Sequence, residues 1–259
     1  MNLAEERIAA YAARLRLPHL TEHLPALAEE AAAKEWSYTE FVERLLREEA
    51  EAADRRAVEM LEKVATLPFG RTLEDFDFRF QPSVKERQLR ELASCAFVER
   101  RENVIFLGPP GVGKTHLAVA LALEALRRRQ KVKFTTAAAL VGSLAEAERI
   151  GTLARRLALF TGPSLLIIDE IGFLPLDAHQ ANLFFQVVSR RYEQGSIILT
   201  SNKSYGEWAE VFSGDAVIAA AVLDRLLHHS TTISIKGESY RLKDKKRAGL
   251  IAARNATTE

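Results

Sequence analysis

Gly108-Pro109-Pro110-Gly111-Val112-Gly113-Lys114-Thr115 is the stretch that decides the fold, and His116 follows it directly. It comes after the apolar run 103–107 and leads into a helical pattern at 117–126. A glycine-rich loop between a strand and a helix points backbone N–H groups at an anion, and the positive end of the helix dipole adds to the attraction. In such a loop the lysine reaches the β- and γ-phosphates, while the threonine hydroxyl holds Mg²⁺. A chance glycine turn would not need the complete motif, so residues 108–116 predict a nucleoside triphosphate site.

Composition is typical of a globular protein, with 47% hydrophobic and 27% charged residues in 259. The single cysteine, Cys95, rules out an internal disulfide framework. The acidic start has no apolar segment of a secretion signal, and no apolar run approaches the ~18 residues of a membrane span. We therefore expect a cytoplasmic protein without membrane contact.

Domain organisation follows from glycine and charge. Residues 1–66 contain no glycine, and they carry 9 Lys/Arg against 14 Asp/Glu, whereas residues 67–259 carry 27 against 21. We expect a small all-helical domain at 1–66 for subunit, partner or DNA contacts, although a plain solvated helix would also explain residues 48–63. Its clearest apolar stripe has helical spacing and consists of Tyr38, Phe41, Val42, Leu45 and Leu46.

Residues 67–82 break the helical pattern and predict a linker. Its alternating aromatics, Phe76, Phe78 and Phe80, either pack near the nucleotide base or anchor the linker. A helix capped by Ser83 is expected next. Across 83–259, short apolar runs alternate with helical stretches, which predicts an α/β domain with a central parallel five-stranded sheet covered on both faces. The expected strands are 104–107, 132–135, 165–169, 197–200 and 231–235.

Two expected strands end in polar groups. Asp169 and Glu170 follow the apolar run 165–168, and Asn202 follows the run 197–199. Ligands bind at the carboxyl ends of strands in such sheets. We expect Asp169 to orient Mg²⁺, Glu170 to polarise the attacking water, and Asn202 to orient that water or sense the γ-phosphate.

Arg225 lies on an expected helix and has two readings. It either pairs with Asp224 or a nearby acid, or it reaches the γ-phosphate of an adjacent subunit. His228 and His229 are expected at the surface. His19 and His23 are four residues apart, but no cysteine or acidic partner is evident at a useful spacing, so no metal site is predicted there.

Four segments together resemble the IstB-type helper ATPases of insertion sequences, in the AAA+ class beside the DnaC/DnaA group. They are GPPGVGKTHLAVAL, LLIIDEIGFLPL, ANLFFQVVSRRYEQGSIILTSNKSYGEW and AAVLDRLLHHSTTISIKGESYRLK, and the resemblance covers residues 73–243. It implies ATP and Mg²⁺ as cofactors, with Asn202 as sensor and Arg225 as arginine finger. It also implies a homo-oligomer on duplex DNA, bound without sequence preference, and a transposase partner. Too few residues follow 235 for a full helical lid, so Arg241 is the nearest candidate for a second sensor.

Three basic clusters are candidates for DNA contacts through the phosphate backbone. The first lies in a helical insertion at 137–160, and the resemblance to the DnaA-like group favours it. The second is the run 127–133, and the third is the segment 236–254. The residues named for these contacts are Arg149, Arg155, Arg156, Lys131, Lys133, Lys243, Lys245, Lys246 and Arg247. A DnaC-like helicase loader is the alternative function, and a small-molecule kinase is disfavoured by the combination of Asp169-Glu170, Asn202 and Arg225.

Overall fold

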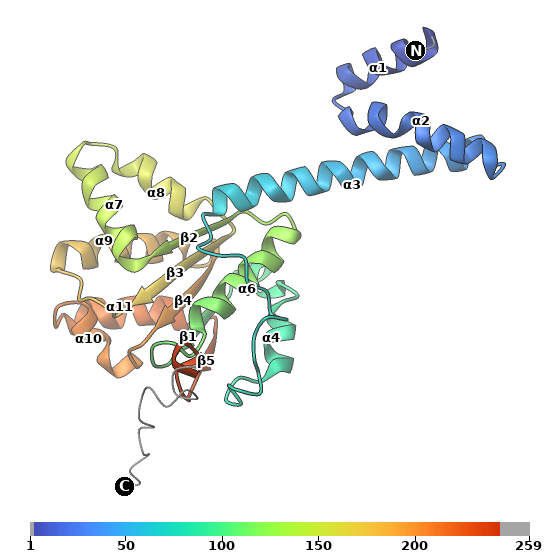
Figure 1. Ribbon diagram of the computed structural model, residues 1–259. Coiled ribbons are helices and arrows are strands. Elements are labelled where there is room, and N and C mark those ends of the chain that lie inside the picture. Colours follow the sequence, from blue (N-terminus) through green and yellow to red (C-terminus); the bar gives the residue numbers. More distant parts are fainter. Residues whose placement is uncertain (1–2, 244–259) are drawn as a thin grey trace. The chain divides into compact units, whose positions relative to one another are not determined.

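The computed structural model describes residues 3–243, and the chain divides into two compact units, Met1–Met60 and Leu61–Glu259. The first unit is helical (Figure 1). It contains α1 (Leu3–Leu15), α2 (Pro18–Ala33) and most of α3 (Tyr38–Ala65). Pro18 occupies the first turn of α2, where its missing N–H costs nothing, and α2 continues past Pro25.

This first unit has a thin core. Its buried hydrophobic residues within 3–60 are Ala12, Leu27 and Ala52. The apolar stripe identified at 38–46 is largely exposed to solvent, and the side chain of Tyr38 is 93% exposed. The α2–α3 pair is held partly by a polar contact, because the buried Glu49 accepts hydrogen bonds from the Leu20 N–H and from Arg56.

The second unit is built on a five-stranded, all-parallel sheet in the order β2-β3-β4-β1-β5 (Figure 1). The strands are β1 (Asn103–Leu107), β2 (Val132–Thr136), β3 (Leu165–Ile171), β4 (Ser196–Ser201) and β5 (Ser230–Ser234). The sequence prediction of this sheet is confirmed. β1 and β4 lie side by side, which brings the loops after β1, β3 and β4 to one edge.

Both faces of the sheet are covered by helices. On one face α6 (Lys114–Arg127), α4 (Glu86–Leu92) and α5 (Ala96–Glu99) pack with Phe106, Ile167 and Ile198. On the other, α7 (Ala137–Arg149), α8 (Leu153–Thr161), α9 (Ala178–Arg191), α10 (Trp208–Val211) and α11 (Ala216–Leu227) pack with Ile105, Ile168 and Leu199. Neighbouring strand residues therefore point to opposite faces, as the period of a strand requires.

Two local predictions have different outcomes. The insertion at 137–160 forms the two helices α7 and α8, as expected. The prediction that Ser83 caps α4 is wrong: α4 begins after Lys85, and the Ser83 hydroxyl instead donates to the Lys236 carbonyl and accepts from the Lys236 N–H. A distant segment thus uses the hydroxyl that would otherwise cap the helix.

After β5, the described chain contains only two short features, a strap of residues 235–243 and the 3₁₀ turn η2 (Tyr240–Leu242) within it. Another 3₁₀ turn, η1 (Tyr205–Glu207), follows β4. Among residues 3–243, none of the helices has the length and apolar character needed to cross a bilayer.

Candidate nucleotide site

The glycine-rich loop connects β1 to α6 at the carboxyl edge of the sheet. Gly113 precedes α6 with φ of +100°, in the region that favours glycine. A Cβ at Gly113 would lie 2.6 Å from Phe76 Cε2, and a Cβ at Gly108 would collide with the Ile235 carbonyl oxygen. The Gly108 N–H donates to the Ser201 carbonyl on β4 at 3.1 Å. Glycine is required at these positions because neighbouring segments pack against the loop and leave no room for a Cβ atom.

Lys114 opens α6 and folds back over the loop. Its ammonium donates to the carbonyls of Gly108 and Pro109 at 2.7 and 2.8 Å. Burial lowers the pKa of Lys114, and the negative charge of Asp169 opposes that shift. A cation held inside the loop is well placed to meet phosphate oxygens.

Asp169 joins the loop to β3. Both of its carboxylate oxygens accept hydrogen bonds from the Thr115 hydroxyl at 3.0 Å, and Asp169 is only 4% exposed. A hydroxyl beside a carboxylate is a set of hard oxygen donors, which suits Mg²⁺. Thr115 and Asp169 would therefore hold the metal, as expected from their sequence positions.

The role of Thr200 was not predicted from the sequence. Its hydroxyl donates to Asp169 Oδ1 at 2.5 Å and accepts from the Glu170 N–H at 2.9 Å. Thr200 is 1% exposed on β4, next to β3. The sequence does contain Thr200 beside Asn202, but only the register of two strands distant in sequence places it against both carboxylate residues.

Glu170 leaves the regular course of β3. Its φ is +62°, a conformation rare outside glycine, and the β3–β4 pairing shifts register between Ile168 and Ile171. The bulge leaves Glu170 exposed directly beside the buried Asp169. Non-glycine residues in this conformation cluster at functional sites, where surrounding structure maintains the strain.

Asn202 follows β4 and is exposed at the same edge. Its side-chain oxygen lies close to Gly172, 3.3 Å from the position a Cβ there would take. The structure therefore brings Lys114, Thr115, Asp169, Glu170 and Asn202 to the ends of three adjacent strands.

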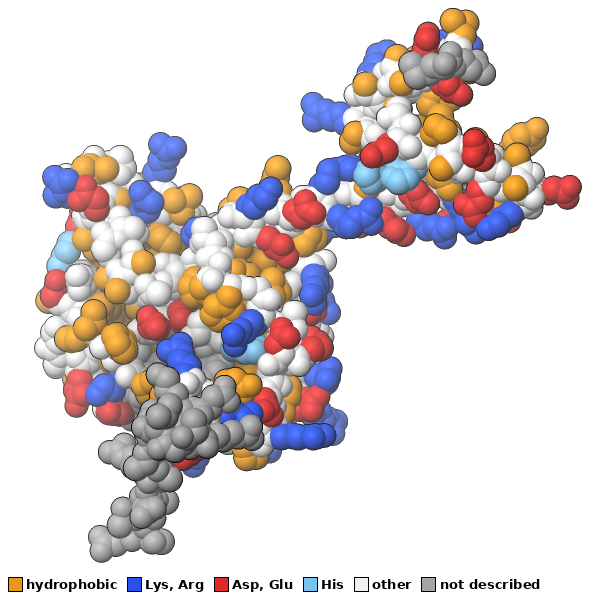
Figure 2. All heavy atoms as spheres, in the orientation of Figure 1, with side chains coloured by type: hydrophobic (Ala, Val, Ile, Leu, Met, Phe, Trp, Pro, Cys, Tyr) orange, Lys and Arg blue, Asp and Glu red, His pale blue; other side chains and the backbone are white. Residues whose placement is uncertain are grey.

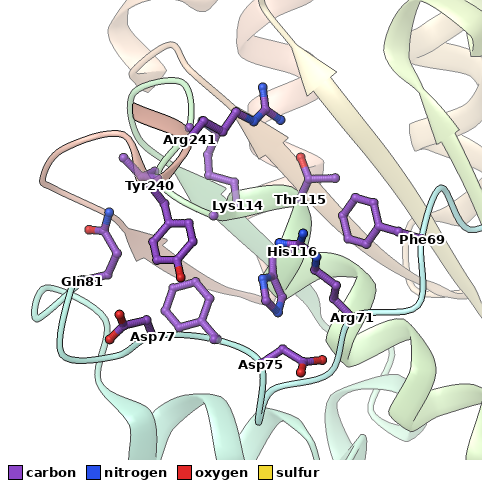
Figure 3. A pocket seen from close by; sticks show the side chains of 14 residues that line it. Phe69, Arg71, Asp75, Asp77, Gln81, Lys114, Thr115, His116, Tyr240 and Arg241 are labelled. Atoms are coloured by element: carbon purple, nitrogen blue, oxygen red, sulfur yellow. The ribbon is translucent and has the colours of Figure 1, made fainter. Parts of the chain in front are cut away.

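A cavity of about 340 Å³ adjoins the loop (Figure 3). In Figure 3, Tyr240 and Arg241 of the strap lie on one side of Lys114, and Phe69 and Arg71 of the linker lie on the other. His116 Nε2 contacts the Thr72 carbonyl at 2.7 Å, which fixes the linker to α6. The sequence placed His116 in the site and offered a place near the nucleotide for the linker aromatics, but it did not predict that the strap would line the cavity.

The linker aromatics have separate roles. Phe76 packs edge-on against His116 and lines the cavity, whereas Phe80 packs edge-on against Tyr240. The strap is tied down by the Tyr240 N–H, which donates to the Gly111 carbonyl at 2.9 Å. The contact of Phe80 with Tyr240 fits the anchoring role, whereas a position of Phe76 near the nucleotide base stays a prediction.

Arg225 lies away from this cavity, near the carboxyl end of α11. It lines a small hollow together with Asn103 and Ile197. Asn103 is the first residue of β1, and Ile197 is the second residue of β4. Its guanidinium donates a hydrogen bond to the Ala221 carbonyl at 2.9 Å and lies 4.8 Å from the centre of the Phe185 ring. These contacts take the place of the pairing with Asp224 that was considered from the sequence. Arg225 is thus at the opposite edge of the sheet from the loop of its own chain.

The basic residues proposed for DNA contacts differ in their surroundings. Arg155 and Arg156 are exposed on α8, and Arg149 pairs with Glu146 on α7. Figure 2 shows Lys and Arg side chains, interspersed with acidic ones, over the part of the surface that α7 and α8 form in Figure 1.

The other clusters are more engaged. In the second run, Arg127 and Arg128 pair with Glu124, Lys131 is exposed, and Lys133 donates to the Thr66 hydroxyl. Lys243 bonds Asp77 at 2.8 Å and contacts the rings of Phe80 and Tyr240. Lys243 therefore connects the strap to the linker. Lys245, Lys246 and Arg247 lie outside the described residues.

The fold and the loop define a P-loop ATP-binding protein of the AAA+ class. The family of IstB-like ATP binding proteins matches residues 10–248, and the chain belongs to that family. It is 50% identical, over 93% of its length and 96% of the relative's, to the protein named as the ATP-binding protein of insertion sequence IS5376 from Geobacillus stearothermophilus. It is 51% identical, over 92% of its length and 89% of the relative's, to the corresponding protein of IS21 from Pseudomonas aeruginosa.

Solved structures support the fold. AMPPCP-bound DnaA from Aquifex aeolicus matches with a TM-score of 0.53 and 24% identity, covering 73% of this chain and 59% of that one. The DnaC helicase loader matches with a TM-score of 0.51 and 23% identity, covering 58% of this chain and 88% of that one. At these identities the likeness establishes the AAA+ fold alone.

Proposed function

We propose that this protein hydrolyses ATP, assembles through ATP into a homo-oligomer on duplex DNA, and stimulates a partner transposase there. The observation that carries the proposal is the contact of Asp169 with Thr115, beside the outward-turned Glu170. One carboxylate is tied to the phosphate loop while its neighbour remains exposed. That division of roles is what ATP hydrolysis needs beyond ATP binding.

The proposed chemistry assigns one task to each group. Mg²⁺, held by Thr115 and Asp169, would neutralise charge on the phosphates. Lys114 binds the β- and γ-phosphates, and Glu170 accepts a hydrogen bond from the attacking water and orients it. Asn202 positions that water from the end of β4, and the exposed Arg241 contacts phosphate from the strap.

The transposase and DNA parts of the proposal draw on the relatives. Both compared relatives are named as ATP-binding proteins of insertion sequences, elements whose movement requires a transposase. The exposed arginines of α8 supply charge for phosphate contacts on DNA of any sequence.

The test compares the wild type with Glu170→Gln, using Glu91→Gln on the exposed end of α4 as the matched control. Phosphate release and ATP-dependent assembly are measured on duplex and on single-stranded DNA of equal length. We expect Glu170→Gln to bind ATP and assemble on duplex DNA while phosphate release falls by at least about 100-fold, a loss of about 2.7 kcal/mol of transition-state stabilisation. Normal turnover in this variant removes Glu170 from its role, and assembly confined to single strands favours a helicase loader.

A further inference from the structure

A cluster of three potential metal ligands lies on α2, far in sequence from the nucleotide site, and a fourth candidate on α3 lies beside one of them. His19, Glu22 and His23 each offer a ligand atom, and these three atoms lie within 4.8 Å of one another. His19 Nδ1 is 3.1 Å from Glu22 Oε2. His23 Nδ1 is 3.8 Å from Glu48 Oε2, which belongs to α3. In Figure 2 these histidines form a pale-blue patch bordered by red side chains on the helical unit.

The cluster overturns the expectation that His19 and His23 lack acidic partners. Residues three and four apart share one helix face, so α2 presents the two imidazoles and Glu22 together. The fourth group could not be anticipated from spacing, because Glu48 is brought in by the packing of α3 against α2.

The separations suit a four-coordinate ion. Zinc ligands lie ~2.1 Å from the metal, so neighbouring donor atoms of a tetrahedral site are roughly 3.4 Å apart. Two separations, 3.1 Å for His19–Glu22 and 3.8 Å for His23–Glu48, lie on either side of that value, and the three ligand atoms on α2 lie within 4.8 Å of one another. Side-chain rotation, of Glu48 above all, would bring the four donors around one ion. The side chains are 30–43% exposed for the histidines and 42% for Glu48, so an ion can enter and the groups can adjust.

The helical unit also needs an additional source of stability. Its buried hydrophobic residues in the described range are Ala12, Leu27 and Ala52, two of which are small. Units below about 70–80 residues rarely obtain enough stability from their core and often use a structural metal instead. A metal that binds only the folded arrangement adds its binding free energy to folding.

We propose that His19, Glu22, His23 and Glu48 bind a zinc-class divalent ion that bridges α2 to α3. Two imidazole nitrogens and two carboxylate oxygens favour zinc and its late first-row neighbours over Mg²⁺, which prefers oxygen ligands alone. A second cluster, Glu193 with His228 and His229, has side chains that are 52–55% exposed, and the Tyr192 hydroxyl already contacts His228 Nδ1 at 2.7 Å. That engagement makes it the weaker ligand set and a useful control.

The first experiment titrates Zn²⁺ into the full-length protein, without a polyhistidine tag, against a chromophoric zinc chelator. The wild type is compared with His19→Ala/His23→Ala and with the control pair His228→Ala/His229→Ala. We expect one zinc per chain, with affinity reduced by more than about 100-fold in the first variant, because even outer-shell partners are worth 10–100-fold. The control pair should bind within about twofold of wild type. Equal affinity in the first variant, or one zinc per two chains in a zinc-dependent dimer, overturns the proposal.

The second experiment tests the bridge itself with Glu48→Gln, which retains the shape of the side chain and both histidines. In the full-length wild-type protein, we expect Zn²⁺ to raise the temperature at which the helical unit unfolds. We expect this shift to be lost in Glu48→Gln. In the Co²⁺-substituted wild type, the visible absorption should be that of a four-coordinate ion and should change in the variant. A full zinc shift in Glu48→Gln would show that α3 supplies no ligand.

Discussion

At the scale of single residues, Thr200 determines how the two carboxylate residues of the site are held. Its hydroxyl is buried between the Asp169 carboxylate and the Glu170 N–H. A buried polar group left without a partner costs about 1–3 kcal/mol. The strained φ of Glu170 is compatible with folding because contacts such as this one stabilise it.

We therefore predict that Thr200→Val, which keeps the shape and removes the hydroxyl, lowers the free energy of unfolding by about 1–3 kcal/mol. ATP turnover should fall about tenfold, equivalent to about 1.4 kcal/mol, with a smaller change in ATP affinity. Urea unfolding, phosphate release and nucleotide titration measure the three quantities. Thr231→Val on β5, on the far side of β1 from β4, is the control. A folded Thr200→Val protein with wild-type turnover contradicts the positioning role.

Some residues of the site could be predicted from a short sequence motif, and others only from the pairing of distant strands. Lys114, Thr115, Asp169 and Glu170 could be placed from the sequence because each belongs to a motif read along one stretch of chain. The role of Thr200 could not, because it depends on the register between β3 and β4. The positive φ of Glu170 was equally hidden, since it results from a bulge in that pairing.

At the scale of elements, the turn η1 stabilises the loop that carries Asn202. The side chain and N–H of Ser204 donate to Glu207, and together with Lys203 they lower the pKa of Glu207 from its ordinary 4.5 to about 2. A carboxyl whose pKa is depressed by folding stabilises the fold above its ordinary pKa. That contribution is lost as pH falls from about 4.5 toward about 2.

We predict that Glu207→Gln lowers stability at neutral pH, and that the difference from wild type shrinks as pH falls through this window. Urea unfolding of both proteins across the acidic range measures the difference directly. Phosphate release at neutral pH should also fall if η1 positions Asn202. A stability difference independent of pH would mean that the charge of Glu207 makes no contribution.

A second prediction concerns α8. Each phosphate contact contributes ~0.9 to the slope of log affinity against log salt concentration. Arg155→Gln/Arg156→Gln should therefore weaken duplex binding and reduce that slope by about 2. The control is Arg127→Gln/Arg128→Gln, two arginines already paired with Glu124. Fluorescence anisotropy over a range of salt gives both slopes, and an unchanged slope in the α8 variant would exclude these arginines.

Elements of the sheet were predictable because apolar runs of strand length alternate with helical periodicity. The N-terminal stripe was harder to interpret, because spacing identifies an apolar face without showing what covers it, and Tyr38 is exposed. The strap across the loop was not predicted, since it consists of single hydrogen bonds such as that from Tyr240 to Gly111.

At the scale of the whole molecule, the position of Arg225 determines how it could take part in hydrolysis. The phosphate loop follows the end of β1, whereas Arg225 shares a hollow with Asn103 at the beginning of that strand. Five residues of strand span about 16 Å at ~3.3 Å each, which is more than an arginine side chain can bridge. Arg225 therefore does not reach the loop of its own chain, and we propose that it acts on the ATP of a neighbouring subunit.

This geometry predicts complementation between two inactive proteins. Arg225→Ala retains its own phosphate loop, and Lys114→Ala retains Arg225, so a mixed interface of the right polarity contains one complete site. We expect each variant alone to lose at least about tenfold in phosphate release, and mixtures to regain activity with a maximum near equal amounts. Mixing Arg225→Ala with the double variant Lys114→Ala/Arg225→Ala should restore nothing, which separates complementation from a general effect of protein concentration. Co-sedimentation on DNA of differently sized fusions verifies that mixed oligomers form, and mixed oligomers without recovered hydrolysis would show that Arg225 acts only within its own subunit, as a packing partner of Phe185.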